Sequence, residues 1–333
     1  MERVFKRSAL WNSQRNLIRR MKILITGANG FLGKHLTKKI NKEISEGAGH
    51  HVFAPRRHQL NCLNYDELYY YCYYNEVDSI IHLAAECGGI GINQLKPADF
   101  FLDNAQMSLN IIKVANKLKL KKTITLGTVC SYPKHTPVPF KEEDLWNGYP
   151  EETNAPYGLA KKNLLVGAQA FAQQYGDNIL HLIPVNMYGE HDHFDLENSH
   201  VIPAMLRKFH TAKESGEPAV CLWGDGSASR EFLYAGDCAE AIWKAFLKYN
   251  KPDPVNIGAA KETTISELAE TIKKLVGYEG EITWDVARPN GQPRRCLDTT
   301  KAKKEFGFVA ETSLENGLKK TYNWFLENIL PSL

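Results

Sequence analysis

The chain has 333 residues, of which 43% are hydrophobic and 24% are charged, a length and composition that suit a sizeable folded core and exclude a disordered protein. Its formal net charge of +3 is unevenly distributed, because residues 1–20 carry +5 and the rest of the chain −2. A nucleic-acid-binding protein is expected to spread its basic residues over the fold, so this distribution predicts no nucleic-acid partner.

The seven cysteines are odd in number and form no Cys-x-x-Cys pair, which argues against a zinc ribbon and a disulfide framework. We therefore predict no metal site and a reducing, cytoplasmic setting. No apolar run approaches the length of a membrane span, and residues 1–20 lack the continuous apolar segment of a secretory signal. We interpret residues 1–20 as a basic N-terminal extension; a targeting or surface-binding amphipathic helix is the alternative.

Strand-like and helix-like segments alternate from Met21 onward. We predict strands at 22–26, 52–54, 79–85, 122–126 and 179–185, and helices at 34–44, 65–75, 103–118 and 157–175. Further on, we predict a helix at 201–215, a strand followed by a helix within 232–249, a strand end at 255–258, a helix at 264–276, a strand at 281–285 and helices within 300–326. This alternation predicts an α/β fold built on a doubly wound parallel sheet.

The predicted elements divide into two lobes after the N-terminal extension. Residues 21–185 and 234–258 are expected to form a Rossmann domain that binds a dinucleotide, and residues 186–233 and 259–333 a smaller C-terminal α/β substrate lobe. Ligands of such sheets bind at the carboxyl ends of the strands, which is where the polar motifs of this chain fall.

The first predicted strand ends in a glycine turn. Gly27, Gly30 and Gly33 are spaced Gly-x-x-Gly-x-x-Gly between a strand and a helix, and this geometry brings backbone N–H groups and a helix N-terminus onto a pyrophosphate. We expect the whole turn to contact the cofactor, including Asn29 and the pair Phe31 and Leu32.

A basic pair follows the second predicted strand. An enzyme that prefers NAD would place a carboxylate there for the ribose 2'-hydroxyl, but this chain has Arg56 and Arg57. Two guanidiniums favour the 2'-phosphate of NADP through charge and fork geometry. We therefore predict NADP(H) as the cofactor; the alternative is a solvated basic turn.

Four chemically reactive side chains lie around the fourth strand and the following helix: Thr128, Cys130, Tyr157 and Lys161. Tyr157 and Lys161 are four residues apart, so on a helix they share one face, and the ammonium is expected to lower the pKa of the phenol. Such a tyrosine can donate a proton to an alkoxide. The plainer interpretation of Cys130 is a small core residue.

The glycine turn, Thr128 and the Tyr157/Lys161 pair, together with Leu83, Ala84 and Ala85, resemble the extended short-chain dehydrogenase/reductase family over residues 21–326. The resemblance implies that Thr128 and Tyr157 hydrogen-bond the reacting oxygen and that Lys161 holds the nicotinamide ribose. It also implies that Leu83, Ala84 and Ala85 lie beside the cofactor. Thr128 stands where serine is common, which keeps the hydroxyl and adds a methyl group.

Several segments are more narrowly similar to the branch of this family that epimerises and reduces GDP-linked 4-keto-6-deoxy sugars: 88–90, 97–100, 130–134, 152–157, 186–189, 198–204, 223–224, 230–233 and 293–294. By that resemblance Cys130 is the base and His200 the acid of epimerisation. The same resemblance implies that four further side chains bind the substrate: Asn186, Lys208, Trp223 and Arg230. It also implies a homodimer formed through helices 103–118 and 157–175.

The residue types suit this chemistry. A 4-keto group acidifies the hydrogens on C3 and C5, and hydroxyls from Thr128 and Tyr157 can hold the enolate oxygen. Inversion needs one group to remove a proton and another to return one to the opposite face. A thiol and an imidazole have ordinary pKa values of about 8.5 and 6.5, close enough to neutrality for either role, so the residues alone leave open which is the base.

Other functions remain to be separated. A reductase that acts only at C4 of a related GDP-4-keto sugar fits the same residues. A dehydratase would be expected to carry an acidic pair directly after Thr128, where Val129 and Cys130 stand, and an epimerase that retains NAD would want a carboxylate where Arg56 and Arg57 stand. A non-catalytic dinucleotide sensor would have no use for the acid/base set, although fold alone does not exclude it.

Overall fold

The computed structural model describes residues 20–195, 199–288 and 290–332, so the predicted extension lies, except for Arg20, outside the described residues. Its centre is a six-stranded sheet in the order β2-β1-β3-β4-β5-β9, with parallel pairing at every step. The strands are β1 (Lys22–Thr26), β2 (His51–Phe53), β3 (Ser79–His82), β4 (Lys122–Leu126), β5 (Ile179–Pro184) and β9 (Val255–Ile257). The predicted doubly wound parallel sheet is confirmed.

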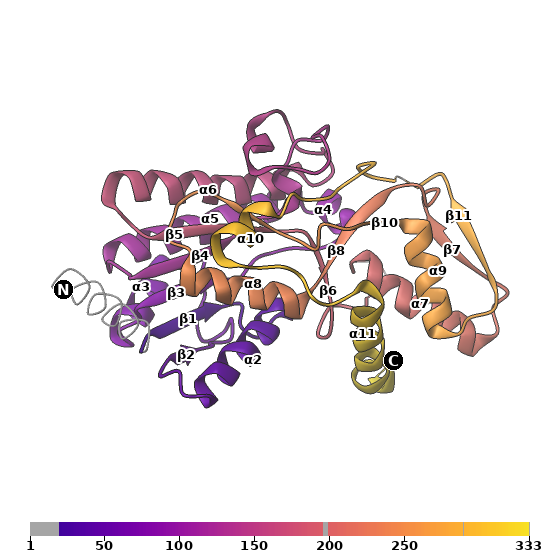
Figure 1. Cartoon of the computed structure of the whole chain (residues 1–333), viewed down its shortest axis with the longest axis horizontal. Coiled ribbons are helices and arrows are strands. Elements are labelled where there is room, and N and C mark those ends of the chain that lie inside the picture. The colour runs from indigo at the N-terminus through magenta and orange to yellow at the C-terminus, as the bar shows by residue number, and fades with distance from the viewer. Residues whose placement is uncertain (1–19, 196–198, 289, 333) are drawn as a thin grey trace, which may run out of the picture.

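Helices cover both faces of this sheet, with α5 (Pro97–Lys117) and α6 (Ala155–Tyr175) on one side and α2 (Phe31–Ser45) and α8 (Ala235–Lys248) on the other (Figure 1). Alternation along the strands explains the two layers. Ile23, Ile25 and Ile81 join the core under α2 and α8, whereas Leu24 and Ile80 join the core with α3 (Tyr65–Tyr74) and α5. All of these strand side chains are buried, and each contributes about 1.5–3 kcal/mol through removal from water.

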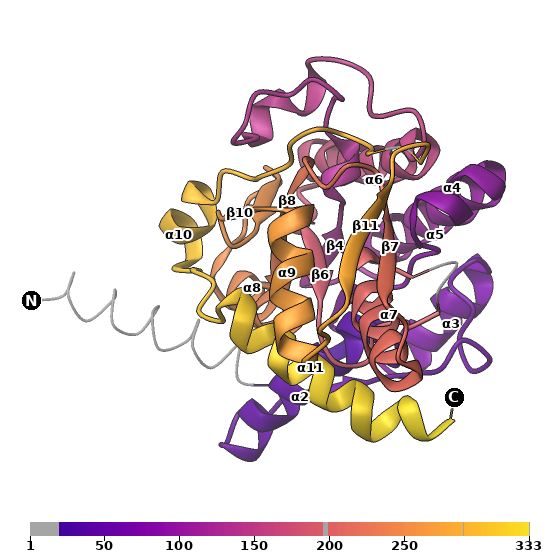
Figure 2. The same cartoon turned by 90° about the vertical axis from the view of Figure 1, so that its right-hand side faces the viewer.

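The second lobe has its own core. Its helices are α7 (Val201–Ser215), α9 (Ile265–Val276) and α11 (Leu314–Asn328), and its strands form a three-stranded sheet, β10-β8-β6, and a two-stranded sheet, β11-β7. These strands are β6 (Asn186–Tyr188), β7 (Ala219–Trp223), β8 (Ser229–Tyr234), β10 (Glu262–Thr264) and β11 (Glu281–Asp285). Figure 2 shows this lobe facing the viewer.

Local signals set the helix boundaries of this lobe. Thr264 accepts a hydrogen bond from the backbone N–H of Glu267, and the Glu267 carboxylate accepts one from the N–H of Thr264. This capping box starts α9, and Gly277, in the left-handed region at φ 72°, ends it.

The tail of the chain serves both lobes. The short helix α10 (Thr300–Phe306) contributes Ala302 and Phe306 to the core of the large sheet. Leu297 and Phe308, on either side of this helix, belong to the same core. Residues 309 onward return to the second core through α11. The residue boundaries proposed for the two lobes stay a prediction. None of the helices in the described ranges has both the length and the apolar character needed to cross a membrane.

Candidate active site

The glycine turn at the end of β1 is built for close approach. Gly27 has φ 72°, and a β-carbon there would lie 2.7 Å from the backbone nitrogen of Ala84; one at Gly33 would collide with the carbonyl oxygen of Gly27. Gly30 is the N-cap of α2, with no side-chain cap and no acidic residue in the first turn. The first N–H groups of a 15-residue helix therefore face an open cradle, a geometry that fits a dinucleotide pyrophosphate.

The rest of the predicted cofactor residues surround this turn. The amide of Asn29 donates to the carbonyl oxygens of Ala54 at 3.2 Å and Pro55 at 3.4 Å, which ties the turn to the loop after β2. Leu83 donates its backbone N–H to the Thr26 carbonyl at 3.1 Å, so the segment after β3 runs directly beside the turn. Four further residues predicted to contact the cofactor lie at the same end of the sheet: Phe31 and Leu32 in the first turn of α2, and Ala84 and Ala85 after β3.

The basic pair after β2 is exposed. Arg57 Nη1 donates to the Glu86 carboxylate at 2.8 Å, and the Arg56 backbone N–H is held by Gln59 at 2.8 Å. The Arg56 side chain is exposed at the same turn. Both guanidiniums are thus available near the loop that Asn29 contacts, and Glu86 is a partner of Arg57 that the sequence did not suggest.

Thr128 and Tyr157 meet at the carboxyl end of β4. Thr128 caps the short 3₁₀ helix η1 (Val129–Ser131), where its hydroxyl accepts the N–H of Cys130 at 3.2 Å, and the same side chain hydrogen-bonds the phenol of Tyr157. Gly158 permits this approach, because a β-carbon there would strike the carbonyl oxygen of Cys130. The two hydroxyls predicted to hold the reacting oxygen are therefore adjacent.

The expected effect of Lys161 on Tyr157 is wrong for this structure. Burial, followed by the neighbouring thiols of Cys87 and Cys130, raises the pKa of Tyr157 well above its ordinary value, and the hydrogen bond from Thr128 only opposes this. Burial also lowers the pKa of Lys161 to about 8. Burial is the largest cause of both shifts, and the phenol stays protonated, which is the state that donates a proton.

Two buried histidines flank Lys161 and are excluded as acids. Burial, with the charge of Lys161, lowers the pKa of His82 and of His181 to about 3. Their Nδ1 atoms lie 2.7 Å from the Thr26 hydroxyl and 3.0 Å from the Thr125 hydroxyl. Both rings are neutral near pH 7 and act as fixed packing around the lysine.

Cys130 is partly buried and packs against the core of the large sheet, so it is a core neighbour whose thiol is still partly exposed. Its sulfur lies 3.7 Å from Nη1 of Arg295 and within electrostatic reach of Tyr157 and Arg230. Burial, with the charge of Arg295, lowers the pKa of Arg230 to about 10, so that guanidinium remains charged. The thiol thus faces a phenol and two cations.

His200 is the N-cap of α7, and its Nδ1 lies 3.4 Å from Oδ1 of Asp192. Surrounding protein atoms lower the pKa of His200 by desolvation, but the hydrogen bond to Asp192 and its negative charge outweigh this and raise the pKa overall. The Asp192 side chain is only 1% exposed, whereas the imidazole is 45% exposed. A shielded carboxylate therefore orients an accessible ring and favours its protonated form.

Electrostatic contacts connect these groups into one region. Cys87, an exposed thiol after β3, is within reach of Tyr157, Lys161 and Asp192, and Asp192 in turn contacts His200. Thr128, Cys130, Tyr157 and Lys161 therefore lie together near the carboxyl end of β4, and His200, at the start of α7, is connected to them through Asp192 and Cys87.

The predicted substrate residues lie mainly in the second lobe. Lys208 donates to the Cys221 carbonyl at 3.4 Å, and Trp223 lies at the end of the same strand, β7, with its ring 51% exposed. Arg230 on β8 donates to the carbonyls of Ser229 at 2.7 Å and Asn290 at 3.1 Å. The fourth, Asn186, begins β6 and donates to the Glu231 carbonyl at 3.3 Å.

Four polar residues of this region were missed from the sequence: Asp192, Arg288, Gln292 and Arg295. Arg288 stacks its guanidinium over the Trp223 ring at 4.9 Å from the centroid, and Gln292 binds Arg295. Arg288 and Arg295 act through Trp223 and Cys130, which are distant in sequence, so only the Pro293/Arg294 similarity gave a signal nearby. Within residues 20–195, 199–288 and 290–332, no cluster of histidine, cysteine and acidic side chains is arranged to hold a metal ion.

Comparisons with known proteins agree with this geometry. Residues 23–258 match the model of the "NAD dependent epimerase/dehydratase family". The GDP-L-fucose synthase of Escherichia coli strain K12 is 36% identical over 318 residues, covering 93% of this chain and 98% of that protein. A solved GDP-6-OMe-4-keto-L-xylo-heptose reductase from C. jejuni superposes with a TM-score of 0.87 at 26% identity, covering 93% of this chain and 98% of the other. A GDP-L-fucose synthetase from Naegleria fowleri bound to NADP gives a TM-score of 0.83 at 27% identity, with 92% and 94% coverage.

Proposed function

The chain is an enzyme of the NAD dependent epimerase/dehydratase family, in the group of nucleotide-sugar epimerases and reductases, and we propose that it is a GDP-L-fucose synthase. In this proposal it converts GDP-4-keto-6-deoxy-mannose to GDP-L-fucose by epimerisation at C3 and C5 and reduction at C4. It is supported by Cys130 beside the adjacent hydroxyls of Thr128 and Tyr157, and by the Asp192 carboxylate that raises the pKa of His200.

The hydroxyl pair has one task in both stages. Thr128 and Tyr157 hydrogen-bond the C4 oxygen, first as a ketone, then as an enolate, and last as an alkoxide. Because burial keeps the phenol protonated, Tyr157 can deliver its proton when the alkoxide forms. The methyl group of Thr128 fills space beside the sugar without removing the hydroxyl.

Epimerisation needs a proton acceptor and a proton donor on opposite faces of the ring. Cys130 takes the proton from the carbon next to the ketone, and the electron pair of the C–H bond moves onto the C4 oxygen. His200 returns a proton to the same carbon, since the Asp192 carboxylate favours the protonated imidazole. This is the division of roles that the family resemblance implied and the residue types alone left open.

NADPH is the proposed cofactor, and when bound it supplies the hydride for C4. The uncapped start of α2 would hold its pyrophosphate, Arg56 and Arg57 its 2'-phosphate, and Lys161 its ribose. Support comes from the steric cradle at Gly27 and from the NADP bound to the Naegleria fowleri relative.

We further propose a homodimer that forms through α5 and α6. The outer faces of these packed helices expose Phe101, Leu102, Leu109 and Val166, and apolar side chains so close together favour burial against a second copy. The cytoplasmic setting stays a prediction.

A C4 reductase without epimerisation is the second candidate, and the likeness to the heptose reductase favours it. Incubation with NADPH and GDP-4-keto-6-deoxy-mannose, followed by NMR of the product sugar, separates the two. GDP-L-fucose supports the proposal, whereas a product reduced at C4 but unchanged at C3 and C5 supports the reductase. No consumption of NADPH contradicts both.

A further inference from the structure

Arg295 is a buried cation with an unusual set of partners. Its side chain is 7% exposed, and Nε and Nη2 donate to Oε1 of Gln292 at 3.1 and 3.0 Å. The remaining nitrogen, Nη1, lies 3.7 Å from the sulfur of Cys130. None of the ion pairs between described residues includes Arg295, so no carboxylate neutralises it.

A guanidinium removed from water is costly unless an anion balances it. Gln292 is neutral and itself buried, and it is fixed by donating to the Lys134 carbonyl at 2.8 Å. The protein atom placed to carry the balancing negative charge is therefore the Cys130 sulfur. We propose that Arg295 is a positioning residue that holds the Cys130 sulfur toward the substrate and stabilises negative charge on it, an inference that rests on the proposed function of Cys130 as the base.

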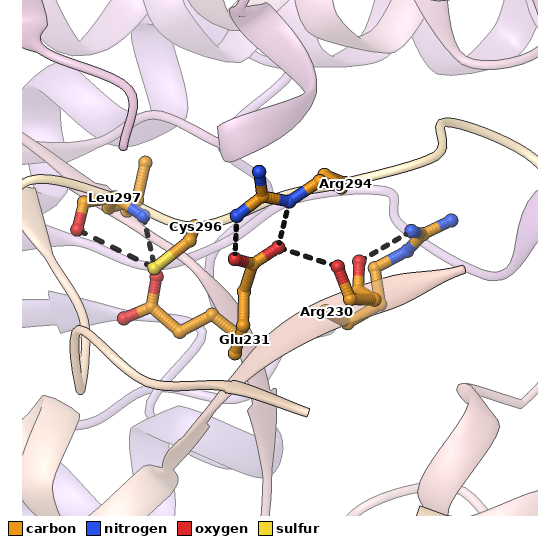
Figure 3. Close-up of polar contacts among 7 residues, drawn as sticks. Arg230, Glu231, Arg294, Cys296 and Leu297 are labelled. Carbon is orange, nitrogen blue, oxygen red and sulfur yellow. Dashed lines mark hydrogen bonds and ion pairs between the residues drawn. The ribbon is translucent and has the colours of Figure 1, made fainter. Parts of the chain in front are cut away.

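The backbone around Arg295 is held in place by β8. The carbonyl oxygen of Arg295 accepts the N–H of Glu231 at 3.0 Å, and the buried Glu231 carboxylate accepts the N–H of Leu297 at 2.7 Å and of Ala260 at 2.6 Å. Figure 3 shows this segment, with Cys296 and Leu297, running alongside Glu231. Residues on both sides of Arg295 are thus fixed, which leaves its guanidinium a defined position.

The other groups that face Cys130 are positively charged or neutral. From β8, Arg230 adds a second positive charge, and from α6 the protonated phenol of Tyr157 adds a neutral donor. The acidic group that acts on Arg230 is Glu151, and its effect is smaller than those of burial, Arg295 and Cys130. The 3.7 Å contact between Arg295 Nη1 and the Cys130 sulfur is thus the polar contact that can hold this sulfur in place while it accepts the proton and the C–H bond breaks.

The neighbouring Arg294 offers a matched control. It lies in the same segment, where Figure 3 labels it, and carries the same charge, but it pairs with Glu262 and not with the thiol. Replacing either arginine by methionine removes one charge and keeps a long side chain. Only the change at Arg295 should affect Cys130.

The test measures how fast iodoacetamide alkylates Cys130 at neutral pH, resolved by peptide mass spectrometry on the full chain without substrate. Arg295→Met should slow alkylation of Cys130 roughly tenfold, Arg295→Lys should restore part of the rate, and Arg294→Met should leave it unchanged. Cys221, exposed on β7, serves as an internal standard whose rate stays constant. The thiolate ultraviolet absorbance that Cys130→Ser removes should fall in Arg295→Met.

Equal alkylation rates in wild type and Arg295→Met would overturn the inference. A second contradicting result would be that Arg295→Met binds GDP more weakly while the alkylation rate of Cys130 is unchanged. That result would mean that the guanidinium binds the phosphates of the nucleotide. If Arg295→Met does not fold, Gln292→Glu takes its place: a carboxylate on the same guanidinium should slow alkylation, and an unchanged rate contradicts the proposal. Because no substrate is present, this result is independent of whether the chain makes GDP-L-fucose.

Discussion

Nδ1 of the accessible His200 ring lies 3.4 Å from the buried carboxylate of Asp192, and this contact raises the pKa of the imidazole. The ring begins α7 in the second lobe, whereas the cofactor cradle belongs to the large sheet. In the proposed reaction, the acid and the hydride donor therefore belong to different lobes, and both lobes must hold the sugar.

The first prediction concerns pH. Since Asp192 raises the pKa of His200, the acid form is present below that raised pKa and is lost as pH rises through it. Asp192→Asn removes the carboxylate charge and should lower the pKa of His200. In a series of reactions in D₂O at rising pH, incorporation of deuterium into the sugar should therefore be lost at a lower pH in Asp192→Asn than in wild type. His193→Gln, a change at an exposed neighbour, is the control that leaves the profile in place. An unshifted alkaline limb in Asp192→Asn would contradict the assignment.

The second prediction separates the two stages. Tyr157→Phe removes the proton donor and should lower the rate of NADPH oxidation by about 100- to 10,000-fold. Exchange at C3 and C5 should fall much less, because Thr128 still holds the C4 oxygen. Thr128→Val should impair both stages and Thr128→Ser neither. Equal losses of reduction and exchange in Tyr157→Phe would argue against its role as the final acid.

The third prediction tests the cofactor. Arg57→Ser should raise the dissociation constant of NADPH roughly tenfold to a hundredfold, the effect of losing one charge-assisted hydrogen bond, and leave that of NADH unchanged. Glu86→Gln releases Arg57 from its ion pair and should tighten NADPH binding. Fluorescence titration measures both constants. Equal affinities of the wild-type chain for NADPH and NADH would remove the NADP preference.

The fourth prediction uses two glycines with nearly the same backbone conformation. Gly27 and Gly176 have φ 72° and 71°, but only at Gly27 would a β-carbon meet protein atoms, with the nearest at 2.7 Å. Gly176→Ala should lower the free energy of unfolding by about 1–2 kcal/mol through the left-handed conformation alone. Gly27→Ala should cost more and abolish cofactor binding. Similar costs in chemical denaturation would mean that the turn relaxes and that the cradle is not tight.

Much of the large sheet could be predicted from the sequence, because its parallel strands are short apolar runs and β1 to β4 are each followed by helical sequence before the next strand. The bounds of β4, α7 and β11 agree with the predicted ranges. The short strands β6 and β10 and the helix α4 (Ile90–Leu95) were missed, since three to six residues show no periodicity. β7 was missed as well, although its side chains alternate between exposed and buried.

The sequence could predict the parts of the candidate site whose residues lie close together along the chain. The Gly27 turn and the Tyr157/Lys161 pair lie within single strand, turn or helix units, so their spacing is informative. Asp192 and Arg295 act on His200 and Cys130 through folding contacts that no local spacing records. The pKa of Tyr157 was mispredicted for the same reason, since burial depends on the packed fold and not on a four-residue interval.

The most direct test of the central claim is turnover of GDP-4-keto-6-deoxy-mannose with NADPH in D₂O, comparing wild type with Cys130→Ser. The account predicts solvent deuterium at both C3 and C5 of the wild-type product, and a product from Cys130→Ser that carries little or none although NADPH binds normally. A wild-type product without deuterium at either carbon would contradict the account and leave a reductase.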